Sequence, residues 1–224
     1  MKSFTGRLVA VQCLVVLCAS AVMPSRTAGQ ASARPCPPSA ERAQWIGTCR
    51  TAVDSLGPLP HVPLYWHLST YPTLVAARSA KGPRSTVVES LGRIWLFTIA
   101  EQAWRPRGGT YVTSIGPLPV NPATNYTAVY MQSIFAPGTT TLVHAHSGPE
   151  AFFTVSGGTC LETPDAVSRD SGSRQILIVR GGPPMQLTST GNEQRRGVVL
   201  ILHDSSQPAT TFDTDWKPAG RCAR

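Results

Sequence analysis

The chain has 224 residues, of which 42% are hydrophobic and 14% are charged, and its formal net charge is +8. This length fits one domain with an extension. The basic residues are scattered and no aromatic residues interleave with a basic stripe, so the sequence indicates no nucleic-acid partner.

Residues 1–30 have the pattern of a signal peptide. Lys2 and Arg7 form a charged start, and the apolar run from residue 8 to about residue 22 follows them. That run has signal-peptide length and is too short and too early for a good membrane span. Loss of the three cations in residues 1–30 would lower the net charge from +8 to about +5. We expect a secreted or periplasmic protein with no membrane association after cleavage; the alternative is an uncleaved anchor.

Four cysteines lie beyond the leader: Cys36, Cys49, Cys160 and Cys222. An even number in an exported domain predicts two disulfides, with three connectivities open. Pairing of Cys36 with Cys49 would staple the N-terminal arm, and pairing of Cys160 with Cys222 would tie the C-terminal tail to a strand. Free thiols or a zinc site are the alternatives, although no Cys-x-x-Cys pair occurs.

Residues 31–83 are expected to form an N-terminal extension. Its first half is rich in Pro, Ala and Ser and is interpreted as an extended arm, with one short helix over Ser39–Thr51. A short strand over Leu64–Leu68 and a helix over Tyr71–Ala80 should follow, because Gly82 and Pro83 end the helical pattern.

From Thr86 onward, short strands dominate the pattern and residues 208–224 form a tail. Short strands with Gly, Pro and Asn between them favour an all-β sandwich or barrel. The predicted strands are Thr86–Ser90, Arg93–Ala100, Thr110–Gly116, Tyr126–Phe135, Thr139–His146, Glu150–Ser156, Thr159–Thr163, Gln175–Val179, Met185–Thr190 and Gly197–His203.

The run from Gly138 to Gly157 carries the chemistry. His144 and His146 are separated by one residue, so on a strand their side chains share one face. The turn signal at Ser147-Gly148-Pro149 would fold Glu150 back toward the two imidazoles. Two imidazoles and a carboxylate that converge form a facial metal site with open positions, as used by non-haem iron and catalytic zinc.

This spacing resembles the first signature motif of the cupin superfamily at every fixed position: Gly138, His144, His146, Glu150 and Gly157. The resemblance implies a cupin-like jelly-roll β-barrel over residues 84–207. It also implies a divalent transition metal (Fe, Mn, Zn or Cu) at His144, His146 and Glu150, and a small-molecule ligand. Oxygenase, isomerase and decarboxylase activities occur in such families, and dimerisation through sheet edges is common among them.

The second motif of that family is degenerate here. Met185 or Pro184 stands where the family has a third histidine, depending on whether Gly182 or Gly181 is matched. Met is a poor ligand for manganese or ferrous iron and a common core filler, so we interpret Met185 as packing. His203 ends an apolar strand and is interpreted as a strand-end residue. Two function classes remain: a metal-dependent enzyme, and a metal-free module that binds a small ligand.

The expected barrel interior follows from parity along the strands. If the three ligands face inward, then so do four further residues, of which Phe152 is either a pocket wall or plain core: Thr140, Leu142, Phe152 and Thr154. Residues 126–133 could present either face to the interior, and the tryptophans at 66, 95 and 104 are expected in the core.

Overall fold

The computed structural model describes Met1 and residues 33–42, 45–170, 174–212 and 214–222. The expected signal peptide, residues 1–30, therefore lies outside the described residues except for Met1. None of the helices in the described ranges has the length and hydropathy needed to cross a membrane.

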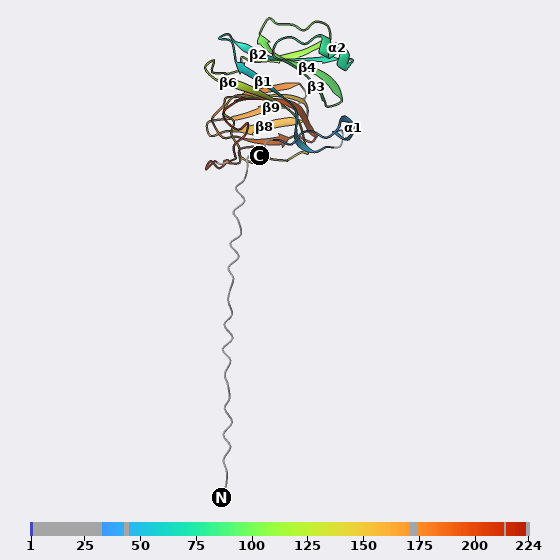
Figure 1. The fold of residues 1–224 in the computed structure, drawn as a ribbon. Helices are drawn as coiled ribbons and strands as arrows, with labels where there is room; N and C mark the ends of the chain where they lie inside the picture. Colours follow the sequence, from blue (N-terminus) through green and yellow to red (C-terminus); the bar gives the residue numbers. More distant parts are fainter. Residues whose placement is uncertain (2–32, 43–44, 171–173, 213, 223–224) are drawn as a thin grey trace.

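The fold is all-β, and its strands form three antiparallel sheets stacked as layers (Figure 1). The outer sheet has the order β3-β4-β2-β5, the central sheet β1-β6-β12-β7-β10, and the third sheet β11-β8-β9. The strands are β1 Gly47–Pro58, β2 Leu64–Tyr71, β3 Ser85–Ser90, β4 Arg93–Glu101, β5 Thr110–Ile115, β6 Asn125–Phe135, β7 Glu150–Ser156, β8 Gly158–Glu162, β9 Val167–Asp170, β10 Gln175–Val179, β11 Gln186–Thr190 and β12 Arg195–Asp204.

The central sheet buries both of its faces. Along β12, Val198 and Leu200 pack in the core shared with the outer sheet, whereas Val199 and Ile201 pack in the core shared with the third sheet. A strand buried on both faces is a continuous apolar run rather than an alternating one. This explains the sequence from Gly197 to Leu202 and places the candidate site in the second core.

The outer-sheet core decides the orientation of β6. Tyr126, Ala128 and Tyr130 pack against the outer sheet with Trp66 and Trp95, both fully buried as predicted. The residues between them on β6 therefore face the third sheet. Tyr130 belongs to the outer-sheet core and takes no part in the candidate site.

Two local predictions are wrong. The helix expected over Ser39–Thr51 covers only α1, Ser39–Arg42, because Gly47 already begins β1, which pairs along its length with β6. The strand expected over Thr139–His146 is not formed; Thr140, His144 and Ala145 make only isolated bridges. The expected helix at Tyr71–Ala80 is confirmed as α2, Leu74–Ser79, with Thr73 as its N-cap.

The sheets do not follow the expected domain ranges. Strand β1, from the expected N-terminal extension, lies in the central sheet, while β3, β4 and β5 lie in the outer sheet with β2. Strands β1, β6, β7, β11 and β12 supply side chains to the cavity at the candidate site, and the two sheets that contain them are one part of a larger sandwich. The domain limits at residues 83 and 207 stay a prediction, since a sheet assignment does not define a domain.

Both disulfides have the pairing that was considered for the tail and the arm. Cys36 bonds Cys49 and Cys160 bonds Cys222. The first closes the short segment before β1, and the second fastens the C-terminal tail to β8. Chain ends are otherwise weakly held, so the second bond bears directly on the segment that covers the site.

Candidate metal centre

The segment between β6 and β7 supplies the two candidate histidines, and the first residue of β7 supplies the carboxylate. His144 forms a two-way backbone bridge with Met185, with N to O distances of 3.0 and 2.7 Å, and the carbonyl of His146 accepts from Gly182 N at 2.8 Å. Glu150 is the first residue of β7. The segment is therefore held as an extended chain beside residues 182–185, although it forms no continuous strand.

A tight turn returns the chain from His146 to Glu150. At Gly148 an added Cβ would lie 2.0 Å from Leu202 O, so only glycine fits against β12 here. The next residue, Pro149, accepts a backbone hydrogen bond from Leu202 N at 2.9 Å. This close contact with β12 sets the position of Glu150 relative to the histidines.

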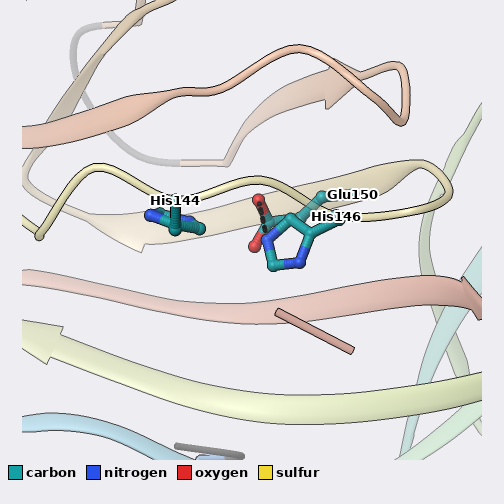
Figure 2. Close-up of side chains that lie close together, drawn as sticks. All are labelled: His144, His146 and Glu150. Carbon is teal, nitrogen blue, oxygen red and sulfur yellow. Dashed lines mark ion pairs between the residues drawn. The ribbon is translucent and has the colours of Figure 1, made fainter. Parts of the chain in front are cut away.

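The three side chains converge as the spacing predicts (Figure 2). One possible ligand atom from each of His144, His146 and Glu150 lies within 4.8 Å of the other two. The imidazole rings of the two histidines are 5.0 Å apart between centroids. His146 and Glu150 are buried at 3% exposure each, and His144 is partly buried.

Hydrogen bonds orient both imidazoles in the same way. His144 Nδ1 donates to Leu142 O at 2.8 Å, and His146 Nδ1 donates to Ala209 O at 2.5 Å. A carbonyl can only accept, so in each neutral ring the proton is on Nδ1 and Nε2 carries a lone pair. Metal-ligating histidines characteristically use their second nitrogen in this way.

The lone pairs of His146 and Glu150 face each other. His146 Nε2 lies 3.3 Å from Glu150 Oε2, and both buried atoms lack any other hydrogen-bond partner. With Nδ1–H bonded to Ala209, a neutral imidazole beside an ionised Glu150 would place two lone pairs in contact, which is unfavourable away from water. A proton on Nε2 or a cation beside both atoms removes this conflict, and the set of two nitrogens and one oxygen fits a transition metal.

The surroundings of the two histidines shift their pKa values in opposite directions. Burial by itself lowers the pKa of His146, but the charge and hydrogen bond of Glu150 and the carbonyl of Ala209 outweigh it and raise that pKa above 6.5. Burial dominates at His144 and lowers its pKa, and the nearby His146 adds to that effect against Glu150 and the Leu142 carbonyl. One imidazole is therefore disposed to hold a proton and the other to stay neutral.

The C-terminal segment covers the site, which no sequence signal had indicated. Thr211 pairs with Ala145 through two backbone hydrogen bonds of 2.8 and 2.9 Å. The ring of Phe212 lies 6.2 Å from that of His144. Farther along, Glu162 on β8 accepts hydrogen bonds from Ala219 N and Arg221 N, at 2.7 and 2.9 Å, beside the second disulfide. The tail is thus fastened at both ends of its path.

A cavity of about 240 Å³ opens beside the three ligands. Phe152 is one of its walls and is 4% exposed, so it serves both as pocket wall and as core. Leu142, expected to face inward, is 74% exposed and lies at the cavity's edge. Thr140 is exposed, because the segment before His146 is not a strand and does not continue the parity of β7. Thr154 lies on β7 itself but is fully buried beside Thr159 and Asp170, outside the cavity lining.

The other candidate residues take structural positions. The Met185 side chain is 1% exposed and packs in the core beside the cavity, as interpreted from the sequence. His203 ends β12, where its Nδ1 donates to the carbonyls of Asp204 and Gln207. Within the described ranges, the group that could hold a metal consists of His144, His146 and Glu150.

The antiparallel sheets around the cavity and the converging His-x-His-x₃-Glu group agree with the fold and the motif that the sequence resemblance implies. The sequence matches no family model and no curated protein.

Solved structures resemble the chain in part. A cupin superfamily protein from Desulfitobacterium hafniense is 13% identical with a TM-score of 0.32, and the match covers 39% of this chain and 74% of that one. The DMSP lyase DddQ from Ruegeria pomeroyi is 15% identical with a TM-score of 0.33, over 38% of this chain and 43% of that one. An oxalate oxidase structure is 18% identical with a TM-score of 0.32, over 41% and 49% of the two chains. Likeness at this level says nothing about activity.

Proposed function

We propose that this chain is an exported, metal-dependent cupin-like protein that acts on a small organic molecule, in the oxygenase or isomerase class. His144 Nε2, His146 Nε2 and a carboxylate oxygen of Glu150 would hold one divalent transition metal. The observation that carries the proposal is the buried contact between His146 Nε2 and Glu150 Oε2, which are 3.3 Å apart and have no other partner.

The surroundings support an open site rather than a closed structural one. Structural zinc sites are normally closed by four protein ligands, whereas catalytic sites keep a position for water or substrate. Here three ligands converge at the wall of a cavity. A metal bound there would supply Lewis-acid character and a point at which substrate could chelate.

The chain's own residues would do the rest. The carbonyls of Leu142 and Ala209 hold the imidazoles in one tautomer and orientation. Phe152 and Val199 exclude water from one side of the site. Preorganised ligands of this kind lose little energy on binding, and apolar walls keep the local dielectric low.

The alternative is a metal-free module that holds a small ligand in the same cavity. The absence of a third histidine favours it, because Met185 lies in the core where the family has that ligand. In that case a proton shared by His146 and Glu150 would take the place of the cation.

Export is part of the proposal. Two disulfides fit an oxidising compartment, since thiols in the cytosol are normally kept reduced.

Metal loading tests the proposal. Protein stripped by a chelator is incubated with iron, manganese, zinc and copper in turn, desalted, and analysed for metal. We expect close to one bound ion per chain for at least one metal, and loss of that ion in His146→Ala. The matched control His203→Ala removes a histidine at the end of β12 and should keep the metal. A stoichiometry near zero with all four metals would leave the metal-free module as the function.

A further inference from the structure

We infer that the substrate or ligand of this cavity is a small molecule of about one ring, with a hydrocarbon body and a single polar end. The polar end lies toward His144, His146 and Glu150, and the far end meets mainly apolar walls. This inference specifies the ligand class of the proposed function. Only the role of the polar end rests on that proposed function.

The side chains of the central sheet that line the cavity form rows, because paired residues on neighbouring strands lie side by side. In the Glu150 row, Glu150 pairs with Ile201 on β12; in the next, the Phe152 row, Phe152 pairs with Val199, which also pairs with Met131 on β6. All five side chains line the cavity. Two residues along a strand cover roughly 7 Å. A molecule anchored at Glu150 therefore reaches apolar side chains within about the length of one substituted ring.

The wall of the cavity opposite the central sheet is also apolar. Met185 pairs with His144 in an isolated bridge, and Leu187 follows two residues later on β11. Both side chains are almost fully buried and line the cavity. This wall is therefore apolar both across from His144 and two residues farther along.

Among the described residues of the lining, hydroxyl groups belong to Thr48, Ser133, Thr141 and Thr210, and two of these groups already accept hydrogen bonds from the protein. Ser133 Oγ already accepts from the guanidinium of Arg195 at 2.7 Å, and Thr141 Oγ1 accepts from Leu187 N at 3.0 Å. Thr210 Oγ1 lies 3.4 Å from His146 Nδ1, so it belongs to the polar end. Glu150 is the carboxylate of the lining, and no lysine or arginine is among the described residues that form it.

The buried cation Arg195 is not among the residues that line the cavity. It is fully buried, its guanidinium carbon lies 5.7 Å from the centre of the Phe152 ring, and its Nε donates to Thr159 Oγ1. Asp170 accepts from the backbone N–H of that same threonine at 2.8 Å. The guanidinium is thus already held by the hydroxyls of Thr159 and Ser133, while its Nη2 makes no hydrogen bond to the described residues.

The volume limits the size of the occupant. About 240 Å³ is below the usual range for drug-sized ligands and corresponds to roughly eight water molecules at liquid density. A dicarboxylate of that size would bury a second charged group with no lysine or arginine in the described lining to pair with it, which weakens binding.

Three probes of equal or similar size test this inference on the zinc-loaded full chain. 4-Ethylphenol and 4-hydroxybenzyl alcohol have the same number of heavy atoms and differ by a methyl against a hydroxyl at the far end, while 4-hydroxybenzoate carries a carboxylate there. Dissociation constants come from ligand-observed NMR titration. We expect 4-ethylphenol to bind at least about tenfold tighter than either polar probe.

A pair of neighbouring valines supplies the matched variants. Val199→Thr places a hydroxyl in the Phe152 row, whereas Val198→Thr makes the same change on the opposite face of β12, in the outer-sheet core. Val199→Thr should reduce the preference for 4-ethylphenol several-fold. Val198→Thr should leave the preference unchanged.

The outcomes separate this inference from the proposed function. The same titrations on chelator-treated protein should keep the preference for 4-ethylphenol, because the apolar walls do not depend on a metal. A preserved preference with no metal bound under any condition would remove the enzyme proposal and keep the ligand class. One bound zinc with equal affinities for the probes, or with no 4-ethylphenol binding, would overturn the ligand class alone. Tightest binding of 4-hydroxybenzoate to both the zinc-loaded and the chelator-treated protein would also overturn it, because the cavity would then accept a carboxylate without help from a metal.

Discussion

His146 and Glu150 are four residues apart, and His146 Nε2 lies 3.3 Å from Glu150 Oε2. Both atoms are buried, and neither makes a hydrogen bond to any other described residue. Ala209, from the C-terminal segment, occupies the other nitrogen of the imidazole. The imidazole therefore carries a second proton on Nε2 or faces a cation there, so a proton and a metal ion compete for this nitrogen.

This competition predicts that metal binding releases a proton. The pKa of His146 in the metal-free chain lies above 6.5 because Glu150 and the Ala209 carbonyl outweigh burial. A ligating imidazole must be neutral, so below that pKa metal affinity should fall by up to about tenfold per pH unit for one proton. The sign is toward tighter binding as pH rises. Calorimetric titration with zinc in buffers of different ionisation enthalpy measures the proton count.

Glu150→Gln is the comparison for that prediction. The carboxamide keeps the shape but removes the charge that raises the pKa of His146. Both proton release near pH 7 and zinc affinity should decrease. Unchanged zinc affinity in this variant would show that Glu150 is not a ligand.

Met185 supplies a second prediction, since its side chain packs beside the cavity. Met185→Leu keeps the volume and should cost under about 1.5 kcal/mol in the free energy of unfolding, with no change in metal content. Met185→His should raise zinc affinity, because residue 185 lies across from His144. The control Leu187→His, two residues farther along the same wall, should not. Loss of the metal in Met185→Leu would make the thioether a ligand and favour a copper site.

The turn between the ligands gives a third prediction. At Gly148 an added Cβ would lie 2.0 Å from Leu202 O, and backbone atoms cannot move aside cheaply. Gly148→Ala should therefore destabilise the fold by at least about 2 kcal/mol, in the upper part of the usual range for single substitutions. At Gly82 the nearest atom would be Ser85 Oγ at 3.9 Å, so Gly82→Ala should change stability little. Denaturant unfolding of the two variants measures the difference; equal stabilities would contradict the close contact with β12.

The two disulfides give a fourth prediction. They close segments with sequence separations of 62 and 13 residues, which the chain-entropy model converts to about 4 and about 3 kcal/mol. Replacing Cys160 and Cys222 together by Ser should cost more stability than replacing Cys36 and Cys49. It should also weaken zinc binding, because the freed tail carries the carbonyl that orients His146. Identical zinc affinity in the two double variants would show that fastening the tail to β8 does not affect zinc binding at the site.

Prediction from the sequence was most successful where the cause is local. The sequence predicts β12 from an apolar run bounded by polar residues, and α2 from the Gly82 and Pro83 that follow it. The prediction is wrong at β1, because the prolines and small residues of this region give no strand pattern and are interpreted as an extended arm with a short helix. That strand forms because β6 offers it a hydrogen-bonding edge, and such a partner is distant in the chain.

The sequence by itself determined which residues could form the site. The spacing of His144, His146 and Glu150, with a turn between them that only glycine permits, brings the three together through local backbone geometry. The tertiary structure decided which nitrogen of each imidazole faces inward, which face of the central sheet lines the cavity, and which cysteines pair. Those depend on contacts such as that of His146 with Ala209, 63 residues away, whose closure is driven by burial of the whole core and not by any local pattern.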